Sequence, residues 1–295
     1  MKKVLITGSD SYIGVSFEKY AEEHYPDLFS IDTIDMIDGS WKMKDFSDYD
    51  VVFHVAGIAH ADVGNVSDER KAMYYTVNTD LATDTVKKAK DDGVKQFVFM
   101  SSAIVYGDSA PYGKIKRITK DTEPSPANFY GDSKWQADKS VRDFSDDRFT
   151  VTVLRPPMIY GKGSKGNYLI LAKIAKKFPF FPDVQNERSM LYIENLCEFL
   201  CQVMIRKEGG IFFPQNAEYT RTSEMVKLIA AVSNHRVHVS KAWNWVVRIA
   251  SIVPGKPKGI ANKAFGNLSY AQDMSIYDFE YQVVDLKTSI KRTER

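Results

Sequence analysis

Two residues four positions apart, Tyr130 and Lys134, could carry proton-transfer chemistry in this sequence. They open a segment with helical spacing, so their side chains are expected on one face of a helix. A phenol has a pKa of about 10, too high for acid–base catalysis near neutrality, but a nearby ammonium favours the phenolate and lowers that value. Ser102, at the end of an expected strand, could hydrogen-bond the same substrate oxygen and steady its charge. The Tyr-x-x-x-Lys spacing alone is as compatible with an ordinary helix as with catalysis.

The start of the chain is expected to hold a phosphate group. Residues 3–14 form an apolar run that is broken by glycine and continues into helical spacing, which predicts a strand, a tight turn and a helix. Such a turn presents free backbone N–H groups and the positive end of the helix dipole, which together favour a pyrophosphate. Gly8 suits the turn, and Gly14 allows the helix to pack closely on the strand. The alternative is an ordinary strand-to-helix turn.

The second expected strand, residues 28–36, carries two acids about where a dinucleotide-binding unit places its ribose ligand. A carboxylate there accepts hydrogen bonds from the ribose hydroxyls and repels a 2′-phosphate. Asp35 is preferred over Asp32 because it falls at the end of the apolar run. No arginine follows in residues 36–38, so NAD is expected and NADP is less favoured. Each acid could instead be a solvated turn residue.

Further elements alternate along the chain. Buried strands are expected within residues 50–60, 94–102 and 149–156, and helical spacing spans residues 73–92. Strands that alternate with helices predict an α/β fold with a Rossmann-type, doubly wound parallel sheet. Residues 39–48 leave little room for a strand and a helix.

Three smaller features of the same region are candidates for a role in function. The strand within residues 50–60 ends in small side chains, which would let a ligand lie against its backbone. His54 and His60 have a catalytic residue type, but His54 lies in an apolar run and is expected to be a satisfied core histidine. The Pro-, Gly- and Lys-rich residues 108–128 are expected to form a solvated surface loop.

Glycine and proline punctuate shorter elements in the second half of the chain. We therefore expect a dinucleotide-binding domain over residues 1–157, with a later return of the chain near 189–205, and a smaller α/β substrate domain over residues 158–295. Within it, the aromatic and basic stretch 243–249, with Lys256 and Lys258, could lie on a membrane surface. A helix packed in the C-terminal domain explains its apolar side chains more simply.

Composition excludes several classes of protein. With 295 residues, 44% of them hydrophobic, the chain can bury a large core, and its net charge of +2 argues against a general nucleic-acid scaffold. No apolar run reaches the roughly 20 residues of a membrane span, and the N-terminus enters a strand directly, so a cytoplasmic protein is expected. Cys197 and Cys201 are expected to be buried free thiols. Two ligands cannot close a zinc site, so no metal is expected.

The order and spacing of these features resemble the extended short-chain dehydrogenases/reductases, the NAD-dependent epimerase/dehydratase family, over essentially the whole chain. Residues 3–14 resemble its Thr-Gly-x-x-Gly-x-x-Gly fingerprint, with Ser11 in place of the middle glycine. Residues 101–107 resemble its serine motif, residues 124–134 its Pro-x-x-x-Tyr-Gly-x-Ser-Lys run, and residues 154–161 its Leu-Arg-Pro-x-Asn-x-Tyr-Gly.

The resemblance implies specific roles. Tyr130 would be the acid–base group, Lys134 would lower its pKa and hold the nicotinamide ribose, and Ser102 would polarise the C4 oxygen of a nucleotide-linked sugar. Cofactor contacts are implied at Gly8, Ser11, Tyr12, Ile13, Gly14, Asp32, Asp35, Ala56, Gly57, Asn78 and Pro156. Substrate contacts are implied at Ser102, Met158, Asn167 and Arg188, of which Arg188 corresponds to an arginine that contacts the substrate's pyrophosphate. Without the family resemblance, Arg188 would be interpreted as a surface salt-bridge residue and Asn167 as a turn residue.

Departures from the family pattern narrow the reaction. Ala103 and Ile104 stand where dehydratases carry an Asp-Glu pair, so dehydration is not expected. Met158 replaces an asparagine that contacts substrate in hexose 4-epimerases. Residues 166–168, 186–189 and 265–268 are closer to bacterial 4-ketoreductases that act on UDP-linked 6-deoxy-hexosamines in capsule and O-antigen synthesis.

We therefore expect NAD-dependent hydride transfer at C4 of a UDP-hexose. The preferred reaction is 4-ketoreduction of a UDP-4-keto-6-deoxy-hexosamine, and the alternative is a redox-neutral 4-epimerase of the UDP-glucose/galactose type. A non-catalytic dinucleotide-binding regulator is a remote alternative, since such proteins often lose the tyrosine or the lysine and this chain has both. Whether the chain forms a homodimer stays open.

Overall fold

A six-stranded parallel sheet forms the centre of the molecule, in a computed structural model that describes residues 1–58 and 66–295. The strand order is β10-β6-β4-β3-β1-β2. Its strands are β1 (Lys2–Thr7), β2 (Phe29–Ile34), β3 (Val51–His54), β4 (Gln96–Met100), β6 (Thr150–Leu154) and β10 (Gly210–Phe212). This arrangement confirms the predicted Rossmann-type α/β fold. His60 and the end of the predicted 50–60 strand lie outside the described residues.

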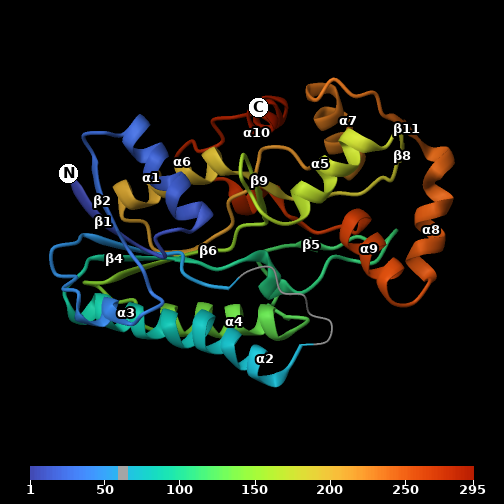
Figure 1. Ribbon diagram of the computed structural model, residues 1–295. Helices are drawn as coiled ribbons and strands as arrows, with labels where there is room; N and C mark the ends of the chain where they lie inside the picture. The colour runs from blue at the N-terminus through green and yellow to red at the C-terminus, as the bar shows by residue number, and fades with distance from the viewer. Residues whose placement is uncertain (59–65) are drawn as a thin grey trace.

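Helices cover both faces of the sheet (Figure 1). One face carries α1 (Tyr12–His24) and α6 (Ile193–Arg206), and the other carries α2 (Asp68–Tyr75), α3 (Leu81–Asp91) and α4 (Phe129–Arg142). Side chains alternate along each strand, so Val4 and Ile6 join the core under α1 while Leu5 joins the core under α3 and α4. Apolar residues therefore run almost without interruption in β1 and β3, as expected of strands buried on both faces.

Capping residues fix where the two site-forming helices begin. The Ser11 Oγ accepts a hydrogen bond from the Gly14 N–H at 3.1 Å, and α1 starts at Tyr12. The Asn128 side chain accepts from the N–H groups of Tyr130 and Gly131, both at 3.1 Å, and α4 starts at Phe129. The helix predicted over residues 73–92 begins earlier in the structure, at Asp68. There α2, a π-turn η2 (Thr76–Asp80) and α3 follow one another without a break.

Helices α5 (Asn167–Lys177), α8 (Asn244–Ile252) and α9 (Lys256–Phe265) lie beyond the carboxyl ends of the strands (Figure 1). Three short parallel pairs join β7 (Met158–Tyr160) to β9 (Met190–Tyr192), β8 (Phe180–Pro182) to β11 (His238–Ser240) and β5 (Arg117–Ile118) to β12 (Ser269–Tyr270). The remaining helices are α7 (Thr222–Val232) and α10 (Leu286–Glu294). Short 3₁₀ turns are η1 (Ser40–Met43), η3 (Ala103–Tyr106), η4 (Lys241–Trp243) and η5 (Gln272–Ser275).

The structure corrects one expectation about the connections. Residues 108–128 are not simply a solvated loop, because β5 within them pairs with β12 from near the end of the chain and buries Ile118. Local composition could not reveal this pairing, which depends on residues about 150 positions away. The short segment 39–48 does hold only η1, as predicted. The chain comes back to the central sheet with α6 and β10, and the division at residue 157 stays a prediction.

The structure also bears on the cysteines and on membrane-spanning helices. Cys197 and Cys201 are buried free thiols on α6, as predicted. In the parts of the chain that the structure describes, none of the helices has both the length and the apolar character needed to cross a membrane.

Candidate active site

The three predicted catalytic residues gather at the carboxyl end of β4. Ser102 lies two residues beyond the strand, and its Oγ accepts a hydrogen bond from the Ile104 N–H at 3.2 Å, which caps η3. Lys134, on α4, donates from Nζ to the Met100 carbonyl at 3.3 Å, at the last residue of the strand. Tyr130 is one turn earlier on α4, on the same helix face. The fold therefore brings the hydroxyl of Ser102 and the Tyr130–Lys134 face to one place.

A glycine lets α4 approach η3 closely. A Cβ at Gly131 would lie 3.0 Å from the Ile104 carbonyl oxygen and 3.1 Å from the Pro126 Cβ. Any larger residue there would push the start of α4 away from η3. Gly131 thus sets the separation between the helix that carries Tyr130 and the turn that follows Ser102.

Burial controls the ionisation of both α4 residues. Lys134 is only 8% exposed, and this burial lowers the pKa of its ammonium to about 8. Burial also raises the pKa of Tyr130 to about 12, with a smaller contribution from the Tyr74 phenol, whose ring centroid is 5.9 Å away. For the chain by itself the pKa of Tyr130 thus lies above its usual value, and the role expected of Lys134 stays a prediction. Desolvation of the phenolate outweighs any attraction from the ammonium, which bonds to the Met100 carbonyl.

Lys134 is enclosed by two residues predicted to contact a cofactor. A Cβ at Gly57 would lie 3.0 Å from the Lys134 Nζ and 3.0 Å from the Asn78 Oδ1. Asn78 is buried in the π-turn, accepts from the Ile58 N–H at 2.8 Å and donates to the Ser133 Oγ at 3.1 Å. It therefore ties the segment after β3 to α4, and the π-turn is what points it there.

The glycine turn after β1 has the geometry that a pyrophosphate requires. Gly8 has φ of +93°, and a Cβ there would lie 3.2 Å from the Ala56 Cα, so only glycine fits. The first backbone N–H groups of α1, which include those of Tyr12 and Ile13, have no partner inside the helix and are available to an anion. The residues present therefore fit a dinucleotide.

The two candidate ribose ligands occupy different places. Asp32 lies within β2, level with Leu5 of β1, and its carboxylate accepts from the Tyr49 hydroxyl at 2.7 Å. Asp35 lies beyond the end of β2, next to Ile34, whose carbonyl accepts from the Gly8 N–H at 2.8 Å. Asp35 is thus adjacent to the glycine turn and Asp32 is not.

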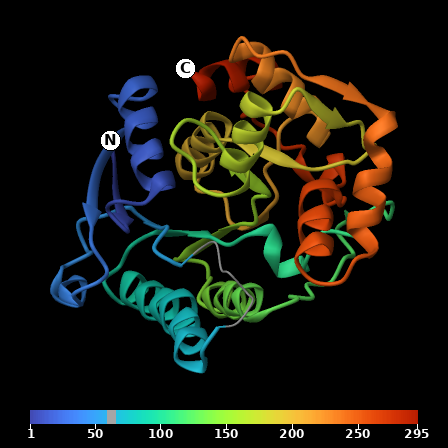
Figure 2. The same cartoon turned by 45° about the vertical axis from the view of Figure 1, so that its right-hand side comes forward.

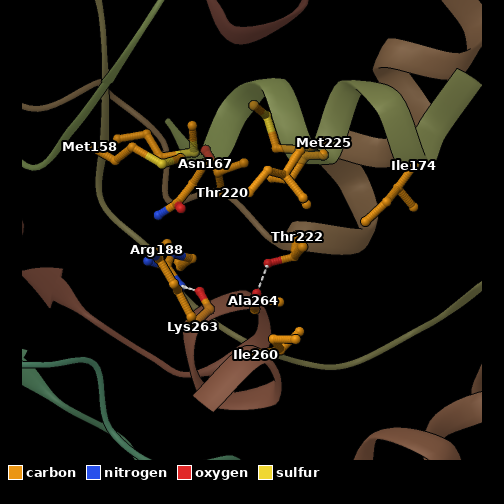
Figure 3. A pocket seen from close by; sticks show the side chains of 13 residues that line it. Met158, Asn167, Ile174, Arg188, Thr220, Thr222, Met225, Ile260, Lys263 and Ala264 are labelled. Atoms are coloured by element: carbon orange, nitrogen blue, oxygen red, sulfur yellow. Dashed lines mark hydrogen bonds between the residues drawn. The ribbon is translucent and has the colours of Figure 1, made fainter. Parts of the chain in front are cut away.

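A cavity of about 230 Å³ brings together Met158, Asn167 and Arg188, the three predicted substrate residues outside the catalytic group (Figure 3). Ser102, Tyr130 and Lys134 do not line it. Asn167 is the first residue of α5, so its interpretation as a turn residue is wrong. The cavity lies between α5, α7 and α9.

Arg188 enters the cavity from the segment before β9. Its Nη1 donates to the carbonyls of Lys263 at 2.7 Å and Gly266 at 3.3 Å, at the end of α9. Burial lowers the pKa of its guanidinium. Within residues 1–58 and 66–295, no carboxylate lies within 4.0 Å of it, so the surface salt-bridge interpretation does not hold. A guanidinium has five N–H donors, and those beyond Nη1 could bind an anion.

Comparison with known proteins identifies the family. The sequence profile of the NAD dependent epimerase/dehydratase family matches residues 4–212, well over half of the chain. The chain belongs to this family.

Two proteins named as 4-epimerases are similar in sequence. A UDP-glucose 4-epimerase of Vibrio cholerae is 30% identical over 256 residues, which cover 78% of this chain and 75% of that protein. The N-acetyl-alpha-D-glucosaminyl-diphospho-ditrans,octacis-undecaprenol 4-epimerase of Escherichia coli O157:H7 is 29% identical over 216 residues, which cover 67% of this chain and 61% of that protein.

Solved structures share the fold at lower identity. A dTDP-4-dehydrorhamnose reductase from Bacillus anthracis, in complex with NADP, superimposes with a TM-score of 0.72 at 18% identity, covering 99% of this chain and 98% of that chain. The chain therefore shares its fold with a reductase.

One polar cluster beside the candidate site has no counterpart in the sequence predictions. Arg155, at the end of β6, is 4% exposed and holds the fully buried Asp138 of α4 through two bonds, from Nε at 2.8 Å and from Nη2 at 2.7 Å. Asp138 also accepts from the Ser101 hydroxyl at 2.7 Å, and Arg155 donates to the Tyr106 hydroxyl at 2.7 Å. This cluster fixes α4, the end of β4 and η3 relative to one another. Asp138 lies four residues after Lys134, a spacing that could have suggested a role.

Pro156 and His54 are two further residues for which the sequence made a prediction. The Pro156 carbonyl accepts from the Ala103 N–H at 2.9 Å, which places it beside the residue after Ser102. His54 is fully buried, as expected of a core histidine, and burial lowers its pKa to about 3. Its Nδ1 pairs with the Thr7 hydroxyl at 2.8 Å, but its Nε2 has no partner in the described part of the chain, so it is only half satisfied.

Proposed function

We propose that this chain transfers hydride to or from C4 of a hexose carried on a diphosphate, with NAD(H) as cofactor. The observation that supports this most directly is the placement of Ser102, Tyr130 and Lys134 around the end of β4, with Gly57 against the Lys134 ammonium. The glycine turn at Gly8 supports cofactor binding, and Arg188 in the neighbouring cavity supports diphosphate binding.

The residues of the chain would divide the reaction between them. Ser102 donates a hydrogen bond to the C4 oxygen, and Tyr130 exchanges a proton with it. In the reductive direction the Tyr130 proton moves to the C4 oxygen as C4 gains hydride, and the phenolate that forms is stabilised by Lys134. Bound NAD(H) supplies or accepts the hydride, and its oxidised ring carries a positive charge. Gly57 and Asn78 keep Lys134 in place during this transfer.

The resemblance to bacterial 4-ketoreductases favours reduction. Met158 stands where hexose 4-epimerases carry an asparagine that contacts substrate, and residues 186–189 and 265–268 are closer to the reductases. We therefore keep 4-ketoreduction, with a UDP-4-keto-6-deoxy-hexosamine as the expected substrate, as the first candidate. A redox-neutral 4-epimerase is the second candidate, because both similar curated proteins are 4-epimerases. Synthesis of a polysaccharide in the cytoplasm is the setting we expect for either.

We propose that the cofactor is NAD rather than NADP because of the position of Asp35. Asp35 follows Ile34, whose carbonyl accepts from the Gly8 N–H, and its carboxylate accepts from the Ile37 N–H at 3.0 Å. A carboxylate at this strand end would bond the ribose hydroxyls and repel a 2′-phosphate.

Two incubations test the reaction. In the first, the protein receives NADH and the 4-keto-6-deoxy sugar made from UDP-GlcNAc, and stoichiometric loss of NADH absorbance is expected. In the second it receives UDP-galactose alone, and formation of UDP-glucose without added cofactor would replace the reductase by the epimerase.

A pair of variants tests the assignment of the acid. Tyr130→Phe is expected to lower turnover by about 10²–10⁴-fold, the usual contribution of general acid catalysis. Tyr74→Phe is the matched control, because it removes a phenol whose ring lies 5.9 Å from that of Tyr130. Normal turnover in Tyr130→Phe would refute the role of Tyr130.

A further inference from the structure

An exposed pair of helices projects from one edge of the molecule. We call residues 244–265, which comprise α8, α9 and their connection, the α8–α9 hairpin. It stands at the right-hand edge in Figure 1 and in the turned view of Figure 2. Trp245, Ile249 and Ile252 recur on one face of α8 and are 58%, 50% and 71% exposed, whereas Val247 faces the core. This helix is thus apolar on the side that it buries and on a side that it shows to solvent.

Charge is segregated around this apolar surface. Residues 225–272 contain seven Lys and Arg residues and no Asp or Glu. The whole chain has 40 basic and 38 acidic residues, so this segment carries +7 and the remainder carries −5. Lys241, Arg248 and Lys258 are exposed on or beside the hairpin. An apolar stripe with tryptophan, flanked by cations, complements an anionic lipid surface, where the side chains enter the headgroup region and the charges meet lipid phosphates.

The cavity beside the hairpin has an apolar rim. Ile260 of α9 and Ile170 of α5 both line the cavity and are 68% and 58% exposed, so they border its opening. Ile174 and Met225 continue the apolar wall (Figure 3). Leu171 lines the cavity as well. The hairpin and the cavity therefore share α9, and the exposed apolar surface continues into the cavity.

The polar groups of the cavity suit a diphosphate. Arg188 and Lys263 are the charged side chains that line it, and both are cationic. The Thr220 hydroxyl also lines it, is buried, and has no hydrogen-bond partner among the described residues. A buried hydroxyl without a partner is costly, and a bound phosphate oxygen would satisfy it.

We propose that the α8–α9 hairpin docks on an anionic membrane surface and that the cavity receives the lipid chain of a lipid-diphosphate sugar. The diphosphate would lie at Arg188, Lys263 and Thr220, and the chain would leave past Ile170 and Ile260 toward the membrane. This inference rests on the proposed function, because the sugar would react at the same Ser102 and Tyr130. The inference adds a lipid diphosphate in the membrane to the nucleotide as a possible carrier of the sugar substrate.

Flotation with lipid vesicles tests the docking surface. Wild-type protein is expected to float with vesicles of phosphatidylcholine and phosphatidylglycerol, and more weakly with phosphatidylcholine alone. The variant Trp245→Ser/Ile249→Ser/Ile252→Ser should bind at least about tenfold more weakly. A matched control is Ile37→Ser/Met43→Ser/Ile276→Ser, which removes three apolar side chains elsewhere that are even more exposed. Equal flotation of both triple variants and wild type would overturn the proposal.

Light scattering after gel filtration tests the main competing occupant, a second copy of the chain. A dimer that only the hairpin variant dissociates, in a protein that does not float with vesicles, would assign the surface to self-association and overturn membrane docking.

Calorimetric titration with farnesyl diphosphate tests the cavity without relying on turnover. Wild type is expected to bind it more tightly than inorganic pyrophosphate, since the apolar wall contributes only for the prenyl compound. Leu171→Trp, which fills the cavity, should remove this preference while vesicle binding is kept. Equal affinities for the two diphosphates would overturn the lipid assignment. Loss of NADH oxidation with binding intact would refute the proposed reaction and leave the lipid site standing.

Discussion

A Cβ on Gly57 would lie 3.0 Å from the Lys134 Nζ, so the glycine leaves the space that the ammonium occupies. Gly57→Ala should therefore displace Lys134, or Asn78 on its other side, by a few tenths of an ångström. We expect kcat to fall by about 10–100-fold, since small misplacements of catalytic groups are costly. Single-turnover oxidation of NADH measures this.

Gly259→Ala is the control for that prediction. No atom lies within 4 Å of its Cβ position, and its backbone does not require glycine, so its rate should match the wild type. A Gly57→Ala enzyme as fast as this control would show that Lys134 has room to spare.

Burial of Lys134 is expected to make the folded protein less stable at neutral pH. Its pKa falls from 10.5 to about 8 on folding, so the unfolded chain binds an extra proton between these values and stability rises with pH through this window. The full penalty is present below pH 8. Lys134→Met should raise the free energy of unfolding near pH 7 by up to about 3 kcal/mol, from 1.36 kcal/mol per pKa unit.

Urea unfolding of variant and wild type at pH 7.0 and pH 9.5 checks this, and the gain from Lys134→Met should be smaller at pH 9.5. The comparison at each pH cancels the buried thiols Cys197 and Cys201, whose raised pKa values lower the stability of both proteins over the same range. Lys139→Met removes an exposed lysine from the same helix and should leave both values unchanged. A Lys134→Met protein less stable than wild type at pH 7 would contradict the prediction.

The Arg155–Asp138 pair should be more important for stability than any surface pair. Arg155→Met leaves the Asp138 carboxylate buried without its two hydrogen bonds from Arg155, and we expect a loss of about 3–5 kcal/mol in the free energy of unfolding. Arg142→Met removes a half-buried third partner and should cost about 1 kcal/mol or less. Urea titrations of the two variants side by side decide the matter, and similar losses would show that the buried pair has no special role.

Cofactor choice should depend on Asp35 and not on Asp32. Asp35→Ser removes the carboxylate that follows the end of β2 and should narrow the preference for NADH over NADPH by about tenfold or more. Asp32→Ser breaks the bond to Tyr49 and should leave that preference unchanged. Fluorescence titration with both reduced cofactors gives the ratio. Tighter binding of NADPH by the wild type would reverse the assignment.

Local patterns in the sequence determined much of this protein. The apolar run before Gly8 and the helical spacing after it predicted β1 and α1, because a buried parallel strand and an amphipathic helix each have their own period. The spacing of Tyr130 and Lys134 placed both on one face of α4 for the same reason. These features depend only on neighbours within a few residues.

Only the tertiary structure decided the features that depend on residues far apart in the chain. It paired β5 with β12, joined Arg155 to Asp138, and raised the Tyr130 pKa, because burial and long-range contacts follow from packing and leave no local period. It also distinguished Asp35 from Asp32 by the register of β2 against β1. The cavity between α5, α7 and α9 arises likewise from segments far apart in the sequence, and no single one of them could have revealed it.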